Sequence, residues 1–311
     1  MLPILESILP IFLLVLLGVL LKRWPLINEN LWGGLEQLGY YVLFPALLFE
    51  TLSRADFSTM DMGAVSVVAL LSVGIMSALV LALWRPLNRL GLEGPAFTSI
   101  FQTATRWNGF MALAIADKLS GPVGLTIVAV IMATIIIPLN VLNVGVMIWF
   151  SGNGRSLRDF VLKIVSNPII LGAASGVVVN VAGIPVYEPL MTAVDLVARS
   201  SLGLGLLMVG AGLRIMDALR PHPNVLIGTA LKLLVFPAVM TSVAVLFGVE
   251  GEVLAMLALS AAVPTAMNGY LLAKQMGGDA PLYAATATVQ TIAAVFTIPI
   301  VLYLVGQLAA G

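Results

Sequence analysis

The stretch TSIFQTATRWNGFMALAIA (residues 98–116) decides how this chain folds. It lies inside a long apolar segment, yet its middle holds five residues that are unusual for a helix in lipid: Thr103, Thr105, Arg106, Asn108 and Gly109. Glycine costs about 1 kcal/mol relative to alanine in a helix interior, and asparagine competes for backbone hydrogen bonds. We therefore predict that a membrane helix is interrupted here, between Arg106 and Gly109.

A second stretch, LALSAAVPTAMNGYLLAKQ (residues 257–275), repeats the pattern. Its middle again holds five polar or helix-weakening residues: Ser260, Pro264, Thr265, Asn268 and Gly269. Pro264 removes a backbone donor and clashes with the preceding turn. Both stretches carry Asn-Gly followed by an aromatic residue. The pattern predicts a second interruption, between Pro264 and Gly269.

The composition of the chain is that of a protein embedded in a membrane. Of its 311 residues, 60% are hydrophobic and only 10% are charged, whereas a soluble domain carries about 25% charged residues. Several windows exceed the roughly 18 apolar residues that indicate a membrane span. These windows are continuously apolar rather than alternating, which disfavours a membrane β-barrel. We predict an all-α polytopic membrane protein.

The residue inventory also excludes several classes of site. The chain has no cysteine and one histidine, His222, so no thiol or histidine cluster is available for a metal ion. The sequence has no phosphate-binding P-loop and no convincing pair of deep aspartates, so it predicts neither an enzyme nor a cofactor. Zero net charge and the lack of a basic run indicate no nucleic-acid partner. The apolar N-terminus is typical of a first span rather than of a cleaved signal.

Clusters of charge, glycine and proline divide the chain into ten expected spans, at residues 3–21, 31–53, 62–84, 93–117, 122–150, 160–182, 187–213, 222–248, 252–276 and 281–309. Five spans precede a short linker at residues 151–160 and five follow it. An odd number of spans reverses orientation, so two related halves, 1–150 and 161–311, would be inverted repeats. GLEGPAF (91–97) resembles GVEGEVL (248–254), and NGF (108–110) resembles NGY (268–270). The fourth and ninth spans are therefore expected to correspond.

The basic residues predict the orientation of the spans. The odd-numbered loops hold ten lysines and arginines, whereas the even-numbered loops hold only Arg54 and Lys118. Cytoplasmic loops carry the excess of positive charge. We therefore expect the linker at 151–160 to be cytoplasmic and both termini to face away from the cytoplasm, in a cytoplasmic membrane.

The two interruptions point to a ligand site. Broken backbone survives at membrane depth only if it is buried in protein or lines a wet cavity, and paired breaks in two halves indicate the binding site of a transporter. The second half-helices would begin near Gly109 and Gly269, where free N–H groups and the positive end of the helix dipole suit an anion. Arg106 adds a fork that matches a carboxylate. Alternatively, Arg106 forms a structural ion pair, for which the candidate carboxylates are Glu36, Glu50 and Asp195.

Other polar residues on the spans are candidates either for the lining of this site or for hydrogen bonds between helices: Thr103, Thr105, Asn140, Asn143 and Gln290. Glu50 with Arg54, and Asp195 with Arg199, have the i,i+4 spacing of helical ion pairs. Lys232 lies early in the eighth span and is expected to extend to the cytoplasmic surface. Glycines in GAASG (172–176) and at 203, 205, 210 and 212 are expected to allow close helix packing.

Several motifs together resemble the auxin efflux carrier family, in its prokaryotic branch: YYVLFPALLF (40–49), SLGLGLLMVGAGLR (201–214), LKLLVFPAVM (231–240) and the segment 263–302. This family is related to the plant PIN carriers and more distantly to bile acid/sodium symporters. The resemblance implies ten helices in two inverted five-helix repeats, with broken fourth and ninth helices that cross at the substrate site. It also implies a scaffold that often dimerises and an elevator-like alternating access. The first crossover departs from the family pattern, because it has no proline.

We therefore predict a secondary transporter of a small organic anion. The site would lie at Arg106–Gly109 and Pro264–Gly269, with Arg106 as the counter-ion and Asn108, Thr265 and Asn268 as hydrogen-bonding groups. A homodimer in the lipid bilayer is expected. The alternatives are a sodium-coupled symporter of the bile-acid type and a membrane receptor that binds its ligand without moving it. The sequence identifies neither the substrate nor a coupling ion.

Overall fold

The computed structural model describes the whole chain except residues 1, 58–61, 152–166, 220–222 and 309–311. Every regular element in the described residues is helical. The first half contains α1 (Leu2–Lys22), α2 (Asn30–Leu38), η1 (Gly39–Leu43), α3 (Phe44–Ser53), α4 (Met62–Ala82), α5 (Trp84–Arg89), α6 (Gly94–Thr105) and α7 (Gly109–Ser151). The second half contains α9 (Pro168–Val181), α10 (Glu188–Gly212), α11 (Ile215–Ala218), α12 (Pro223–Ala230), η2 (Leu231–Val235), α13 (Phe236–Leu246), α14 (Gly251–Ala262), α15 (Gly269–Met276) and α16 (Ala280–Leu308).

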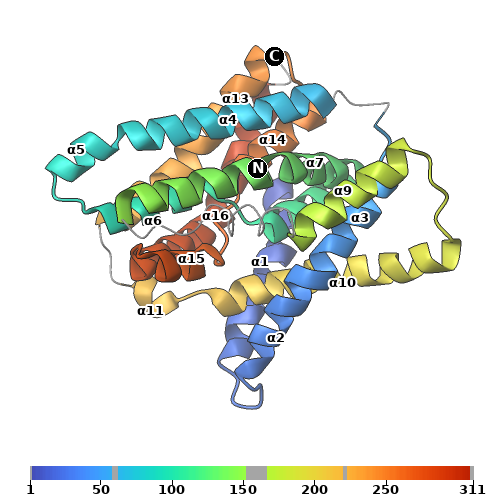
Figure 1. Ribbon diagram of the computed structural model, residues 1–311, viewed down its shortest axis with the longest axis horizontal. Coiled ribbons are helices and arrows are strands. Elements are labelled where there is room, and N and C mark those ends of the chain that lie inside the picture. The colour runs from blue at the N-terminus through green and yellow to red at the C-terminus, as the bar shows by residue number, and fades with distance from the viewer. Residues whose placement is uncertain (1, 58–61, 152–166, 220–222, 309–311) are drawn as a thin grey trace.

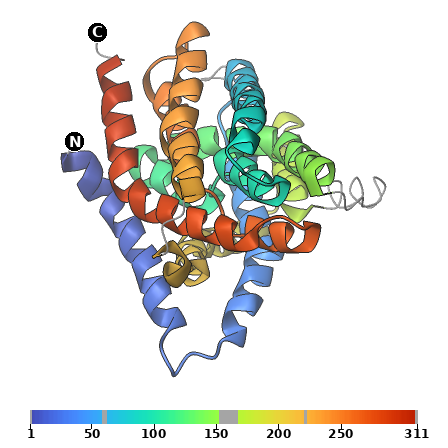
Figure 2. The ribbon, with the colours of Figure 1, turned by 90° about the vertical axis from the view of Figure 1, so that its left-hand side faces the viewer.

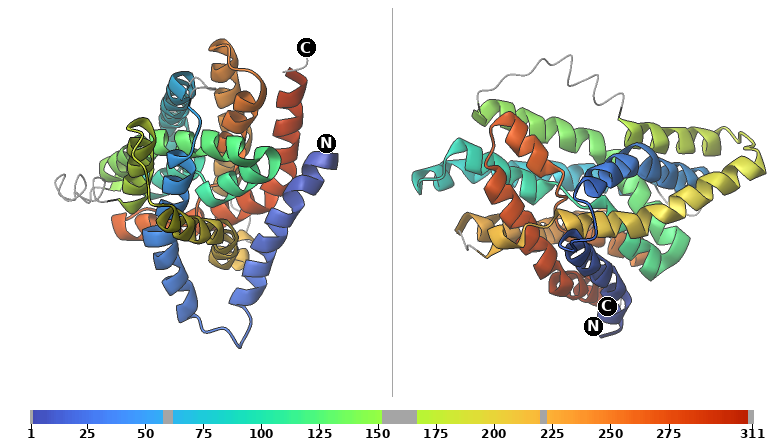
Figure 3. Two further views of the ribbon diagram at one scale, coloured as in Figure 1. Left: turned by 90° about the vertical axis from the view of Figure 1, so that its right-hand side faces the viewer. Right: turned by 90° about the horizontal axis from the view of Figure 1, so that it is seen from below.

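These elements group into the ten predicted spans, which confirms the polytopic helical fold. Six helical stretches of the described chain are long and apolar enough to cross a membrane: Ile4–Lys22, Met62–Arg89, Gly94–Phe150, Glu188–Gly212, Pro223–Leu246 and Ala280–Leu308. The stretch 94–150 contains two expected spans, and a non-helical Gly121 divides it (φ 55°, ψ −143°). The start of α1 and the end of α16 lie at the same end of the molecule (Figure 2 and Figure 3), as an even number of spans requires.

Two spans pass through a proline by widening the helix for one turn. η1 precedes Phe44-Pro45 and η2 precedes Phe236-Pro237. The Phe44 N–H donates to the Gly39 carbonyl, and the Phe236 N–H donates to the Leu231 carbonyl, each five residues back. A proline inside a regular α-helix clashes with the carbonyl four residues earlier. The wider π turn lets both spans continue without a break.

The segments before the fourth and ninth spans have the same local structure. Gly91 (φ 89°) and Gly248 (φ 70°) adopt the left-handed conformation that glycine tolerates. The next N–H closes the same type of bond in both places, from Leu92 to Leu87 (3.0 Å) and from Val249 to Ala244 (2.9 Å). These are Schellman caps, and each is followed by a helix of 12 residues, α6 or α14. The similarity of GLEG and GVEG is thus a similarity of structure, while the division into inverted repeats stays a prediction.

A group of four helices, α1, α3, α9 and α10, packs through glycine. We call this group the glycine-packed helices. A side chain at Gly172 or Gly176 of α9 would meet the backbone of Pro45 or Phe49 on α3. A side chain at Gly210 of α10 would meet the Val15 carbonyl of α1. Helices in lipid associate by such close backbone approach, so the predicted role is confirmed for Gly172, Gly176 and Gly210. Gly205 lies against the Phe110 ring, Gly212 meets the Met267 side chain, and Gly203 has open space around it.

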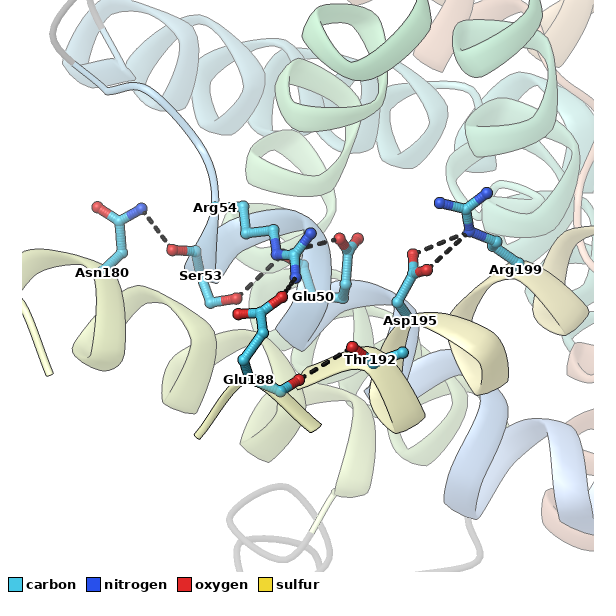
Figure 4. A network of polar contacts seen from close by, with 8 residues as sticks. All are labelled: Glu50, Ser53, Arg54, Asn180, Glu188, Thr192, Asp195 and Arg199. Atoms are coloured by element: carbon cyan, nitrogen blue, oxygen red, sulfur yellow. Dashed lines mark hydrogen bonds and ion pairs between the residues drawn. The ribbon is translucent and has the colours of Figure 1, made fainter. Parts of the chain in front are cut away.

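A polar network joins three of these helices, which lie together at one side of the molecule (Figure 1). Figure 4 shows Arg54, the residue after α3, between two carboxylates. Its Nε lies 3.7 Å from Glu50 Oε1, and its Nη2 lies 3.9 Å from Oε1 of Glu188 on α10. Arg199 Nε lies 2.9 Å from Asp195 Oδ2. Asn180 of α9 donates to the carbonyls of Ser53 (3.0 Å) and Ala55 (2.8 Å) at the end of α3. Both predicted ion pairs are confirmed, whereas almost all of the linker 151–160 lies outside the described residues.

We predict that Gly210→Ala lowers the melting temperature of the purified protein. The added methyl group would push α10 away from α1, and overpacking costs about 1–3 kcal/mol. Gly203→Ala on the same helix is the matched control, which should melt at or above the wild-type temperature because alanine favours a helix by about 1 kcal/mol. Equal melting temperatures for the two variants would contradict the glycine packing.

Candidate functional site

Both predicted helix interruptions are present. α6 ends at Thr105, and Arg106 has an extended backbone (φ −70°, ψ 160°) before α7 begins at Gly109. α14 ends at Ala262, and Val263 is likewise extended (φ −65°, ψ 147°) before α15 begins at Gly269. The first break therefore forms without a proline, and the second is longer.

The two breaks meet at one backbone hydrogen bond. The Asn108 N–H donates to the Pro264 carbonyl over 2.8 Å. The Asn108 side chain accepts a bond from the Met111 N–H (3.2 Å), which caps the start of α7. Asn108 thus supplies hydrogen-bond partners for two backbone groups that the breaks release, the Met111 N–H and the Pro264 carbonyl. The crossing of the fourth and ninth spans is present in the structure.

Side chains of the last span, α16, form hydrogen bonds with backbone groups beside both breaks. Gln290 Oε1 accepts the Thr265 N–H (2.9 Å), while Gln290 Nε2 donates to the carbonyls of Thr103 (3.1 Å) and Gly228 (3.0 Å). The Tyr283 hydroxyl donates to the Ala266 carbonyl (2.6 Å) and lies 3.0 Å from Thr265 Oγ1. Three groups of the second break and one carbonyl at the end of α6 are therefore fixed by two side chains of α16.

Arg106 lies at the crossing without a carboxylate partner in the described chain. Its Nη2 donates to the neutral amide oxygen of Asn140 (3.1 Å), and its buried Nε has no hydrogen-bond partner. Of the three carboxylates predicted as possible partners, Glu50 faces Arg54 and Asp195 faces Arg199, while Glu36 lies on α2 and forms no ion pair with Arg106. The guanidinium therefore has an Nε–H donor without a partner, and no carboxylate in the described chain balances its positive charge.

The two candidate asparagines of α7 support the end of α6. Asn140 donates to the Ile136 carbonyl (2.8 Å) and presents its oxygen to Arg106. Asn143 donates to the Leu139 carbonyl (2.7 Å) and presents its oxygen to Thr105 (3.4 Å). The hydroxyl of Thr103 bonds to the Ser99 carbonyl (2.9 Å) within its own helix. Asn140, Asn143 and Thr105 thus form contacts between α7 and the end of α6, which is one of the two roles predicted for them, whereas the Thr103 hydroxyl bonds only within α6.

The two Asn-Gly pairs are not equivalent in their surroundings. Asn108 is 2% exposed, whereas Asn268 is exposed and makes no side-chain cap bond to α15. A side chain at Gly269 would overlap the Tyr283 ring, while one at Gly109 would lie 3.1 Å from Phe44. The asparagine of the second pair is therefore exposed, and its glycine allows α15 to approach α16.

The position expected for Lys232 was wrong. The side chain does not extend to the surface: it is 0% exposed, its Nζ lies 4.5 Å from the centroid of the Phe236 ring, and it has no hydrogen-bond partner. Its turn, η2, is covered by α6, α14 and α16. Position along the span suggested an interfacial lysine, and only the packing of these three helices places it inside.

Sequence analysis also missed Tyr283. The stripe Tyr283, Thr286, Gln290 has the i, i+3, i+7 spacing of one helix face, which is the signal that identifies it. All three side chains are buried. A polar face on a helix without any charged residue indicates contacts inside the protein rather than with lipid.

Two cavities of the molecule lie away from the crossing. One of about 390 Å³ is lined by residues of α3, α9 and α10, including Arg54, Asn180 and Glu188. Another of about 330 Å³ is lined by Ile4, Ser120 and apolar residues of α14 and α16. The polar groups of the first bond to one another or to backbone. The crossing itself is closely packed, since Thr105, Thr265 and Gln290 are at most 1% exposed.

Comparisons with known proteins agree with a role in transport. A family model described as "Membrane transport protein" matches residues 153–302. An uncharacterized transporter of Methanothermobacter thermautotrophicus is 24% identical over 299 residues, covering 95% of this chain and 96% of the relative. The uncharacterized transporter YfdV of Escherichia coli K12 is 22% identical over 306 residues, covering 96% of each chain.

We predict that Lys232→Met raises the melting temperature. Methionine keeps the apolar stem and removes a buried amine without a hydrogen-bond partner, a group that costs about 1–3 kcal/mol. The control is Lys274→Met at an exposed position of α15, which should leave the melting temperature unchanged. A lower melting temperature for Lys232→Met would mean that the amine stabilises the fold.

Proposed function

We propose that this chain, a member of the auxin efflux carrier family, carries a small organic anion across the cytoplasmic membrane and binds it where the fourth and ninth spans cross. That the chain is a membrane transporter follows from the family match and from the names of its relatives. The substrate class, the site and the mechanism are our proposal.

The observation that carries the proposal is the state of Arg106. A charged side chain inside a membrane is costly and pairs with an opposite charge or serves function. Arg106 has a neutral amide as its partner and a free Nε–H. A ligand carboxylate would supply the missing negative charge and accept two parallel bonds from the guanidinium.

The helix starts beside Arg106 favour the same charge. α7 and α15 both begin next to the crossing, and their first N–H groups have no partner within the helix. The positive ends of two helix dipoles and one guanidinium therefore surround the break. The exposed amide of Asn268 adds a donor that fits a second oxygen of the anion. A cation would find no described carboxylate in this arrangement.

Two groups of helices support an elevator-type movement. Hydrogen bonds from Gln290 and Tyr283 tie α6, α12, α14 and α16 into one unit, while glycine contacts and ion pairs tie the glycine-packed helices into another. Phe110 of α7, two residues after the first break, packs against the glycine-packed helices: its ring lies 4.3 Å from the Phe44 ring and against Gly205. An apolar contact of this kind can slide without the loss of a hydrogen bond, while a hydrogen bond from the Arg214 N–H after α10 to Thr288 Oγ1 of α16 (3.1 Å) joins the two groups.

We predict that a stabilising organic acid, found by a melting-temperature screen on the purified protein, binds roughly 10- to 100-fold more weakly to Arg106→Gln. Hydrogen bonds to a charged group contribute about 1.5–3 kcal/mol, which this substitution removes. Arg54→Gln in the network of Figure 4 is the control and should keep the wild-type affinity. Unchanged affinity in Arg106→Gln would refute the counter-ion role, and stabilisation by cations or neutral solutes alone would refute the anion assignment.

A carrier and a receptor differ in one measurement. Proteoliposomes loaded with the unlabelled acid should accumulate the labelled acid by counterflow if the protein is a carrier. Binding without counterflow would favour the receptor.

A further inference from the structure

The side chain of Gln290 forms three hydrogen bonds with backbone groups at the crossing. Its amide is 0% exposed and fully used: the oxygen accepts one N–H, from Thr265, and the nitrogen donates to two carbonyls, of Thr103 and Gly228. An amide group has only two donor hydrogens. One side chain therefore joins the end of α6, the helix α12 and the unwound segment after α14.

The carbonyl of Thr103 lies at the end of a broken helix. Thr103 lies in the last turn of α6, where the extended Arg106 ends the helix and leaves carbonyls without helical partners. The dipole of α6 adds partial negative charge at this end. Carbonyls at the ends of broken membrane helices are the groups that coordinate coupling cations in transporters with this architecture. Here the carbonyl of this kind, that of Thr103, is occupied by Nε2 of Gln290, which also donates to the Gly228 carbonyl of the continuous eighth span.

The close approach of the three helices is built into the sequence. A side chain at Gly228 would lie 2.9 Å from Thr103 Oγ1 and 2.8 Å from Thr286 Cγ2. Because position 228 is a glycine, its carbonyl can approach closely enough to accept a hydrogen bond from Gln290 Nε2, which also donates to the Thr103 carbonyl. One helical turn later, Lys232 adds a buried amine to the same helix. The arrangement supplies nitrogen donors where a cation site would need oxygen ligands.

We propose that Gln290 is a positioning residue that takes the place of a coupling cation: its amide holds the broken helices together, so the crossing forms without bound sodium. The inference rests on the proposed function for its meaning in transport, although the hydrogen bonds stand without it. The proposal also predicts that one substitution, Gln290→Glu, would create a cation site. Gln290→Glu replaces the donor nitrogen by an oxygen and places a carboxylate beside the carbonyls of Thr103 and Gly228.

The test uses the sodium ion itself as the probe and requires no known substrate. Melting temperatures of the full-length protein are measured in sodium, potassium and N-methylglucamine chloride at equal ionic strength. The wild type should melt at one temperature in all three salts. Gln290→Glu should melt lower than the wild type in potassium and should recover in sodium. Gln290→Met, which can neither donate these bonds nor bind a cation, should melt lower in every salt.

Each other outcome overturns the proposal. Stabilisation of the wild type by sodium would mean that a cation site exists beside Gln290. A wild-type melting temperature for Gln290→Met would mean that the amide bonds do not hold the crossing. A Gln290→Glu protein that ignores sodium would show that these carbonyls are not cation ligands. The ligand screen with Arg106→Gln is independent of all three, so failure of the anion site and failure of this inference are distinguishable.

Discussion

Inside a membrane, every backbone group that a broken helix releases must find a partner within the protein. The bond from the Asn108 N–H to the Pro264 carbonyl meets this requirement for both breaks at once. It can form only where the fourth and ninth spans cross, so the break of each span depends on the presence of the other. The amide of Gln290 and the hydroxyl of Tyr283 extend the same solution to Thr265 and Ala266. The position of Arg106, and with it the candidate site, follows from this crossing.

The rest of the molecule separates into parts that serve different ends. The glycine-packed helices pack closely because glycines lie where they meet, and ion pairs of Arg54 with Glu50 and Glu188 add polar contacts (Figure 4). The helices around the crossing are joined by hydrogen bonds from side chains to freed backbone groups. The aromatic contact of Phe110 on α7 with Phe44 adds apolar packing, and a hydrogen bond from the Arg214 N–H to Thr288 Oγ1 joins the end of α10 to α16. We propose that the unit around the crossing moves while its internal geometry is kept.

Local chemistry was sufficient to predict the breaks, because glycine, proline and asparagine act on the backbone of their own segment. The same holds for the pairs Glu50–Arg54 and Asp195–Arg199, whose partners lie one turn apart. The roles of Lys232 and Tyr283 could not be predicted in this way. Whether a lysine near the start of a span reaches water depends on which helices cover it, and that is decided by contacts distant in sequence. The partner of Arg106 stayed open for the same reason.

Gln290 is the clearest example of a residue whose role depends on contacts distant in sequence. Its type and depth marked it as a candidate, but its meaning lies in its partners, which are 25, 62 and 187 residues away along the chain. Sequence analysis weighed lining against helix contact and could not see that one amide joins both breaks. Gln290 bonds to backbone groups of α6, α12 and the segment after α14. The geometry around Arg106, where we propose that the ligand binds, depends on these bonds.

The central claim is that an organic anion binds where the two broken helices cross. The most direct measurement is an experimental structure of the protein with a bromine-labelled form of the stabilising acid, in which anomalous scattering locates the bromine. The account predicts a peak beside Arg106, between the starts of α7 and α15. A peak instead in the 390 Å³ cavity lined by Arg54, Asn180 and Glu188 would contradict it.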